Sequence, residues 1–237
     1  RGEVVLILGV ESASSQVGCA IGGHEGVLAS AHSGRGGLHA ENLAPQIEFV
    51  RRQAGIELGD LGAVAVDVGP GLFTGLRVGI ATALAVAYAL GLPMIGVSSL
   101  DLLAFPARWT GRLVVTALDA RRGELFTALF RQVPGGIQRV RDANVCTSAE
   151  LVAELQALDE PMLLVGDGAL RYAGAFQAIG RMELAEQGLA HPSARALVQL
   201  AHARAMREEF VRPWDLEPVY LRKPDVDINW STRQGGS

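Results

Sequence analysis

Cysteine, aromatic residues and runs of positive charge are all scarce in this sequence. Its two cysteines, Cys19 and Cys146, lie far apart without a C-x-x-C motif, which argues against a disulfide framework or a zinc ribbon and fits a reducing compartment. The net charge is -4, and the longest basic clusters are the arginine pairs at 51–52 and 121–122. The chain alone therefore lacks a basic stripe that could neutralise many phosphates.

Long apolar segments and a secretion signal are missing as well. The apolar run near the start has only about seven residues, and no small-residue cleavage site follows it. No stretch approaches the roughly 20 apolar residues that a membrane-spanning helix needs. We therefore expect a cytoplasmic protein.

Small residues, by contrast, are abundant. Of the 237 residues, 29 are glycine, and 49% of the chain is hydrophobic. This composition and length predict an α/β protein with two modest lobes. Hydrophobic spacing in the first half predicts three antiparallel strands followed by a helix, a strand, a helix and a strand, at residues 4–10, 17–23, 27–31, 39–54, 63–68, 75–92 and 93–97.

The second half repeats this order in part. It begins with a hairpin around Gly123, followed by a helix at 148–158 with Ser148 as its N-cap, a strand at 162–168 and helices near 169–179 and 193–210. We predict three segments: an N-terminal lobe that carries the partner-binding helices, a smaller C-terminal lobe and a flexible tail, at residues 1–106, 107–222 and 223–237.

The stretch GPGLFTGLRVG, residues 69–79, looks like a phosphate-binding loop. It matches neither G-x-x-x-x-G-K-[ST], because it has no lysine, nor G-x-G-x-x-G, because Gly75 follows Gly71 at the wrong spacing. A strand-to-helix turn still presents backbone N–H groups, so weak anion binding near Gly69 and Gly71 stays open as an alternative.

The helix after this loop carries a ridge of small residues. Gly75, Gly79, Ala83, Ala87 and Gly91 recur at intervals of four. Glycine inside a helix costs about 0.5–1 kcal/mol relative to alanine, so this ridge needs a compensating close contact. It packs either on the chain's own sheet or on another subunit, and the two alternatives are left open.

For the second alternative, the preceding helix adds its own apolar stripe to the contact. Two helices from each of two subunits would then meet. The predicted partner-binding residues are Leu43, Ile47, Val50, Gly75, Leu76, Gly79, Ile80, Ala83 and Ala87. On this hypothesis Gly79→Leu or Ala83→Glu abolishes pairing and leaves the monomer folded.

A conventional active site is hard to find in the sequence. None of the five histidines has a second histidine four residues away, and the segment HAENL carries Leu43 where a second zinc ligand would stand. No G-x-S-x-G motif occurs, although a Ser-His-Asp triad need not be local in sequence. The sequence therefore predicts neither a metal site nor a serine hydrolase.

Five segments in this order resemble the TsaB (YeaZ) family: LILGVESASSQVGCAI, HAENLAPQI, GPGLFTGLRVG, LDARRGELF and EPVYLR. The resemblance covers residues 4–222. It implies the actin-like, sugar-kinase-like and Hsp70-like (ASKHA) fold, with two related lobes that each have a mixed sheet and flanking helices. It also implies a role in making the threonylcarbamoyladenosine of tRNA.

The resemblance further implies a non-catalytic subunit. The metal-containing transferase of the pathway, the paralogue TsaD, carries two metal-binding histidines in GVNHLEGH, where this chain reads GVSSLDLL with Ser99 and Leu103. Implied partners are a TsaD-type transferase, a TsaE-type ATPase, a second copy of the chain, and tRNA indirectly through the complex.

The resemblance implies no cofactor on this chain alone, with ATP or ADP at the interface of the complex. It places the candidate anion site at Glu11, Ser12, Gly69 and Gly71. Because Glu11 stands where this fold usually carries aspartate, ATP hydrolysis by this chain is not expected. The alternatives are a stand-alone metallopeptidase-like hydrolase and a small-molecule kinase on the same fold.

Overall fold

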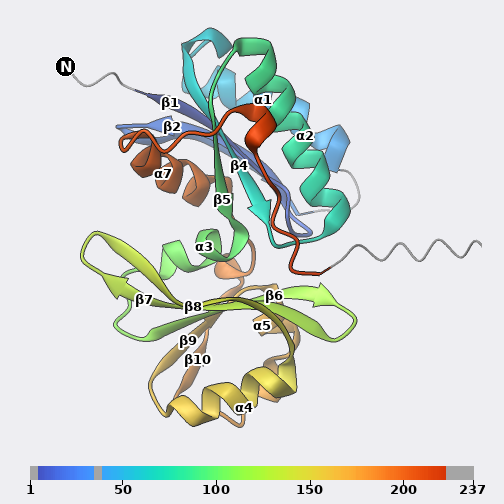
Figure 1. Ribbon diagram of the computed structural model, residues 1–237, viewed down its shortest axis with the longest axis vertical. Helices are drawn as coiled ribbons and strands as arrows, with labels where there is room; N and C mark the ends of the chain where they lie inside the picture. Colours follow the sequence, from blue (N-terminus) through green and yellow to red (C-terminus); the bar gives the residue numbers. More distant parts are fainter. Residues whose placement is uncertain (1–4, 35–38, 223–237) are drawn as a thin grey trace, which may run out of the picture.

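The computed structural model describes residues 5–34 and 39–222, which form two lobes that each contain a five-stranded mixed sheet (Figure 1). The first sheet has the order β3-β2-β1-β4-β5. Its strands are β1 (Leu6–Glu11), β2 (Val17–Gly23), β3 (Gly26–Ser33), β4 (Leu61–Gly69) and β5 (Met94–Ser98). Strands β1, β2 and β3 are antiparallel neighbours, whereas β4 runs parallel to both β1 and β5. The predicted β-β-β-α-β-α-β order is confirmed.

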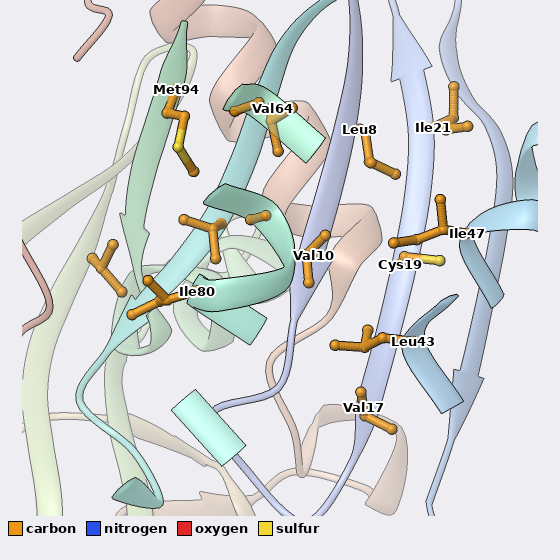
Figure 2. Packing of buried hydrophobic residues seen from close by; sticks show 14 of the residues in the cluster. Leu8, Val10, Val17, Cys19, Ile21, Leu43, Ile47, Val64, Ile80 and Met94 are labelled. Carbon is orange, nitrogen blue, oxygen red and sulfur yellow. The ribbon is translucent and has the colours of Figure 1, made fainter. Parts of the chain in front are cut away.

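Both faces of this sheet are covered because its central strands are apolar on both sides. On one face, Leu8 and Val10 pack under α1 (His39–Ala54) and α2 (Phe73–Leu90), as Figure 2 shows. On the other face, Ile7 packs against α7 (Ala194–Ala205). Such continuous apolar runs are typical of strands that are buried on both faces.

The second sheet has the order β10-β9-β6-β7-β8. Its strands are β6 (Leu113–Arg121), β7 (Glu124–Val133), β8 (Gly136–Thr147), β9 (Met162–Val165) and β10 (Met182–Leu184). Helices α4 (Ser148–Leu158), α5 (Asp167–Arg171) and α6 (Ala173–Phe176) cover one face, and α3 (Ser99–Ala104) lies against the other, between the lobes (Figure 1). The N-cap of α4 is Thr147, not the predicted Ser148, and its side chain forms a capping box with Glu150.

The predicted extent of the C-terminal lobe, 107–222, is wrong for its last part. Helix α7 returns to the first lobe, where Leu197 and Ala201 join Ile7 and Val97 in one apolar cluster. The reason is that the second face of the first sheet is apolar and needs a cover, which α7 provides. The predicted tail, 223–237, lies outside the described residues.

Four short 3-10 helices complete the described chain: η1 (Leu58–Asp60), η2 (Phe105–Ala107), η3 (Gln187–Leu189) and η4 (Pro213–Asp215). Of these, η2 continues α3 toward the second lobe, and η3 precedes α7. The chain therefore crosses between the lobes near η2 and again between η3 and α7, and both crossings lie beside α3.

Candidate functional site

The glycine-rich loop between β4 and α2 packs against the loop that follows β1. The Leu72 N–H donates to the Ala13 carbonyl over 2.7 Å, and a Cβ on Gly71 would overlap that carbonyl. Gly69 has a φ of 99°, in the region that favours glycine. These glycines therefore permit a left-handed turn and a close backbone approach within the chain.

Part of the candidate anion site at Glu11, Ser12, Gly69 and Gly71 makes contacts within the chain. The side chains of Glu11 and Ser12 are buried, and the N–H of Leu72 already has a protein acceptor. The Ser12 hydroxyl donates to the Gly75 carbonyl over 2.8 Å. The Leu72 N–H and the Ser12 hydroxyl are thus engaged within the chain, and anion binding at this loop stays a prediction.

The small ridge of α2 also faces the chain's own core. A Cβ on Gly79 would overlap the Ser12 hydroxyl, so no side chain fits there. All nine residues predicted to bind a partner are buried: Leu43, Ile47, Val50, Gly75, Leu76, Gly79, Ile80, Ala83 and Ala87. Their assignment to a partner surface is therefore corrected, because a residue buried against its own sheet has no surface to offer.

The opposite side of α2 is exposed and still apolar. We call the exposed or half-buried residues of this side the outer α2 face, namely Val78, Ala81, Leu84, Ala85 and Tyr88. The Tyr88 side chain is 76% exposed. On α1, Phe49 is 53% exposed, so both helices present large apolar groups to solvent. Both helices that the sequence analysis assigned to a partner thus have an exposed apolar side, opposite to the residues that it named.

Helix α2 is long and apolar enough to cross a membrane by length and composition, contrary to the sequence expectation. Its window Phe73–Leu90 has a mean hydropathy of 1.6 and is 33% buried. One such helix is weak support for a membrane span, because core helices pass the same test. Here one side of α2 packs on the sheet and the other is the outer α2 face, which accounts for the apolar composition.

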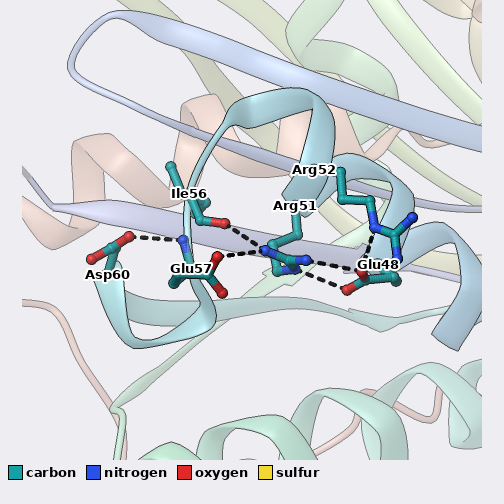
Figure 3. A network of polar contacts seen from close by, with 6 residues as sticks. All are labelled: Glu48, Arg51, Arg52, Ile56, Glu57 and Asp60. Carbon is teal, nitrogen blue, oxygen red and sulfur yellow. Dashed lines mark hydrogen bonds and ion pairs between the residues drawn. The ribbon is translucent and has the colours of Figure 1, made fainter.

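Charged side chains fasten the end of α1 to η1, as Figure 3 shows. Arg51 donates to Glu48 over 2.8 Å, to Glu57 over 3.0 Å and to the Ile56 carbonyl over 3.0 Å. Arg52 donates to Glu48 over 2.6 Å. Hydrogen bonds from Arg51 and Arg52 lower the pKa of Glu48 to about 2. The first Arg-Arg pair is thus engaged inside the chain.

Two buried carboxyl groups lie side by side at the ends of β1 and β4. Burial, and then the charge of Asp67, raise the pKa of Glu11 well above its usual value. Burial also raises the pKa of Asp67 to about 7, although a hydrogen bond from the Ser99 hydroxyl over 2.6 Å opposes this shift. The pair therefore retains at least one proton near neutral pH.

The positions that the resemblance assigns to metal ligands in the transferase are core positions here. Ser99 is fully buried and donates to Asp67, and Leu103 packs in the cluster between α3 and the second sheet. Within residues 5–34 and 39–222, no group of three or more His, Cys, Asp or Glu side chains is arranged to hold a metal ion. Glu11 and Asp67 alone are too few for a usual oxygen-ligand site.

A polar pocket of about 440 Å³ lies between the β6–β7 hairpin and the turn after β9. In it Asp119 forms ion pairs with Arg121 and Arg171, each at 3.3 Å, and its N–H donates to Asp167 over 2.9 Å. Burial lowers the pKa of His191, against the opposing charge of Asp167. Carboxylates and guanidinium groups neutralise each other here, so the network joins two loops.

Sequence reasoning missed Asp67, Asp167 and His191. Both aspartates lie at or just after the end of a buried strand, where the ends of neighbouring parallel strands bring side chains together. That signal was present in the apolar runs before them. His191 had no comparable signal, because only the return of α7 to the first lobe brings it near Asp167.

Comparisons with known proteins agree with one another. Residues 32–230 match the family model described as TsaD, tRNA N6-adenosine threonylcarbamoyltransferase. The tRNA threonylcarbamoyladenosine biosynthesis protein TsaB of Escherichia coli (strain K12) is 31% identical over 200 residues, which cover 83% of this chain and 85% of that protein. The protein of the same name from Bacillus subtilis (strain 168) is 27% identical over 97% of this chain and 100% of its own length.

A solved structure extends this similarity to three dimensions. YeaZ from Pseudomonas aeruginosa superposes with a TM-score of 0.79 at 26% identity, and the match covers 92% of this chain and 100% of that one. The ethanolamine utilization protein EutJ from Carboxydothermus hydrogenoformans matches at 14% identity with a TM-score of 0.50, which supports the ASKHA fold alone.

Proposed function

The chain belongs to the TsaB (YeaZ) family of tRNA threonylcarbamoyladenosine biosynthesis proteins, and from this premise we propose that it binds and activates a transferase of its own fold. On this proposal it is a non-catalytic subunit, and its partner is a TsaD-type threonylcarbamoyltransferase. The match of residues 32–230 to the transferase model supports a common origin of the two chains. Chains of common fold can pair through equivalent surfaces about a pseudo-two-fold axis.

The observation that carries the proposal is the outer α2 face. An apolar helix side with Tyr88 76% exposed is costly in water, and contiguous apolar surface marks interaction sites. Arg77 is also exposed on this helix and gives the patch a polar neighbour. An apolar centre with a polar margin is the usual composition of a protein–protein interface.

We propose further that the isolated chain pairs with itself through the same face. In the complete complex, a TsaE-type ATPase joins the pair, and ATP or ADP binds at an interface between subunits. The chain then meets tRNA indirectly, through the assembled complex. These features come from the family expectation, and the outer α2 face supports only the pairing itself.

Light scattering after size-exclusion chromatography tests the pairing, with the chain alone and with the transferase paralogue of its organism. We expect Ala81→Glu and Ala85→Glu to weaken the heteromeric complex at least about a hundredfold, or about 2.7 kcal/mol, because each places an unpaired charge in an apolar contact. Both positions are exposed, so the monomer should stay folded.

Ala153→Glu on α4 is the matched control, since it changes an exposed helical alanine in the second lobe. It should leave the complex intact. A heteromeric peak that survives both α2 changes at micromolar concentration would rule out this face as the interface. Failure of the unaltered chain to form any complex, even with ATP and the ATPase present, would refute the proposed function.

A further inference from the structure

A second pocket, of about 560 Å³, lies between the lobes and is lined by residues of β2, β3, η2, η3 and the first turn of α7. We call it the arginine pocket, and its principal side chains are Arg108, Arg195, His32, His191, Gln16 and Gln199. Among the described residues that line it there is no aspartate or glutamate.

The two arginines of the pocket differ from most other arginines of the chain. Twelve described arginines are held in ion pairs with Asp or Glu: Arg51, Arg52, Arg112, Arg121, Arg131, Arg139, Arg141, Arg171, Arg204, Arg207, Arg212 and Arg222. Within the described ranges, Arg108 and Arg195 form no such pair, and Arg108 only donates to the Phe105 carbonyl over 2.9 Å. Two uncompensated guanidinium groups at one pocket favour an anionic ligand.

The start of α7 adds to this positive potential. Helix α7 has 12 residues, and its N-cap Ser193 accepts a hydrogen bond from the Ala196 N–H over 3.2 Å. Ala194 and Arg195, the first two residues of the helix, also line the pocket. Their N–H groups have no acceptor among the described residues, and such groups at a helix N-terminus bind phosphate.

An exposed aromatic side chain stands beside the arginine pocket. The Arg108 guanidinium carbon lies 3.9 Å from the ring centroid of Phe105 and 4.8 Å from that of Trp109. The Trp109 side chain is 76% exposed. A free indole face next to a guanidinium group is the arrangement on which unpaired nucleobases stack, and a simple inorganic anion would not require it.

We propose that the arginine pocket binds a single-stranded segment of RNA. Arg108, Arg195 and the N-terminus of α7 hold its phosphates, and Trp109 stacks on a base. The inference rests on the proposed function only for the origin of this RNA, which we assign to tRNA. On this proposal the chain contacts RNA directly at one local site. The sequence as a whole offers no long basic stripe for such a contact.

Fluorescence anisotropy of a labelled single-stranded RNA of about ten nucleotides, titrated with the full chain in about 50 mM salt, tests the proposal. We expect Arg108→Glu and Arg195→Glu each to weaken binding at least about tenfold and to reduce the salt slope by about 0.7 for each phosphate that is no longer neutralised. Arg131→Glu, an equal charge reversal on β7, should stay within about twofold of the unaltered chain. Trp109→Ala should weaken RNA binding about tenfold.

Competition identifies the ligand. Inorganic phosphate or a free mononucleotide should displace the RNA only at far higher concentration, whereas unlabelled single-stranded RNA should displace it stoichiometrically. Equal competition by duplex RNA, together with no effect of Trp109→Ala, would overturn the single-strand assignment. No anisotropy change up to about 100 µM protein, or equal loss with Arg131→Glu, would overturn the pocket assignment itself.

Pairing with the transferase, measured on the same variants by light scattering, separates this inference from the proposed function. Arg108→Glu and Arg195→Glu should leave pairing unchanged, because both lie away from the outer α2 face. Ala85→Glu should weaken pairing at least about a hundredfold and leave RNA binding by the isolated chain unchanged. If one variant lost both pairing and RNA binding while its circular dichroism spectrum stayed normal, the two sites would not be separate.

Discussion

The two sides of α2 are both apolar, yet they differ in how closely they are packed against the rest of the chain. The inner side brings Gly75 and Gly79 to the loop after β1, where the Ser12 hydroxyl donates to the Gly75 carbonyl and leaves no space for a Cβ at Gly79. The outer α2 face is more exposed to solvent, and its largest side chain, Tyr88, is 76% exposed. The small residues reflect close packing inside one chain, and the exposed apolar groups are the basis of the proposed pairing surface.

The largest expected effect comes from filling the inner side with Gly79→Leu. The new side chain would overlap Ser12 and disrupt its hydrogen bond to Gly75. Overpacking and the broken buried hydrogen bond together cost about 4 kcal/mol, and the better helix propensity of leucine returns less than about 1 kcal/mol. The midpoint of thermal unfolding should fall by about 10 °C.

Ala85→Leu is the control for this change, because it adds the same side chain to the outer α2 face. Its effect on stability should stay within about 0.5 kcal/mol. If Gly79→Leu melts like the unaltered chain and removes only the pairing, the ridge contacts a partner after all. That outcome would restore the interface that the sequence predicts. The inner side of α2 would then bind the partner, and the outer α2 face would not.

The next effect concerns the carboxyl pair beside the inner side of α2. The pKa of Glu11 is raised in the folded protein, so folding takes up a proton once the pH exceeds the ordinary value of 4.5. Stability due to this group is fully present below that pH and decreases as the pH rises toward its folded pKa. Glu11→Gln removes this dependence and should stabilise the fold by about 2 kcal/mol at pH 8.

Urea unfolding at pH 5, 7 and 9 measures this difference. The midpoint of the unaltered chain should fall with pH more steeply than that of Glu11→Gln. Some slope should persist in the variant, because the pKa of Asp67 is also raised, to about 7. Parallel pH dependences of the two proteins would show that Glu11 does not carry a raised pKa.

Local patterns in the sequence were sufficient to predict the order of strands and helices in the first lobe from β1 to β5, but not the return of α7 to it. The apolar runs of β1, β2 and β4 and the helical spacing of Leu43, Ile47 and Val50 are local signals, so they place each element near its observed bounds. The same spacing shows that one side of α1 and α2 must be buried. It does not show which molecule buries it, and for that reason the predicted interface fell on core residues.

The polar sites depended on contacts between distant residues. Arg108 and Arg195 are separated by most of the second lobe, and they meet only because α7 returns to the first sheet. Neither belongs to an Arg-Arg pair, so a search for basic clusters along the chain overlooked them. Sites of this kind depend on the path of the chain between elements. Composition and hydrophobic periodicity do not determine that path.

The smallest expected effect tests the inner side through its hydrogen bond. Ser12→Ala should cost only about 1 kcal/mol, since the Gly75 carbonyl keeps its helical donor. The informative measurement is a double-mutant cycle with Gly79→Ala, in which urea unfolding gives the free energy of each protein. A Cβ at position 79 would overlap the Ser12 hydroxyl but would lie 3.2 Å from the Ser12 Cβ. Gly79→Ala should therefore cost less in the Ser12→Ala background, and additive costs would mean that Ser12 does not set the limit on residue size at this ridge.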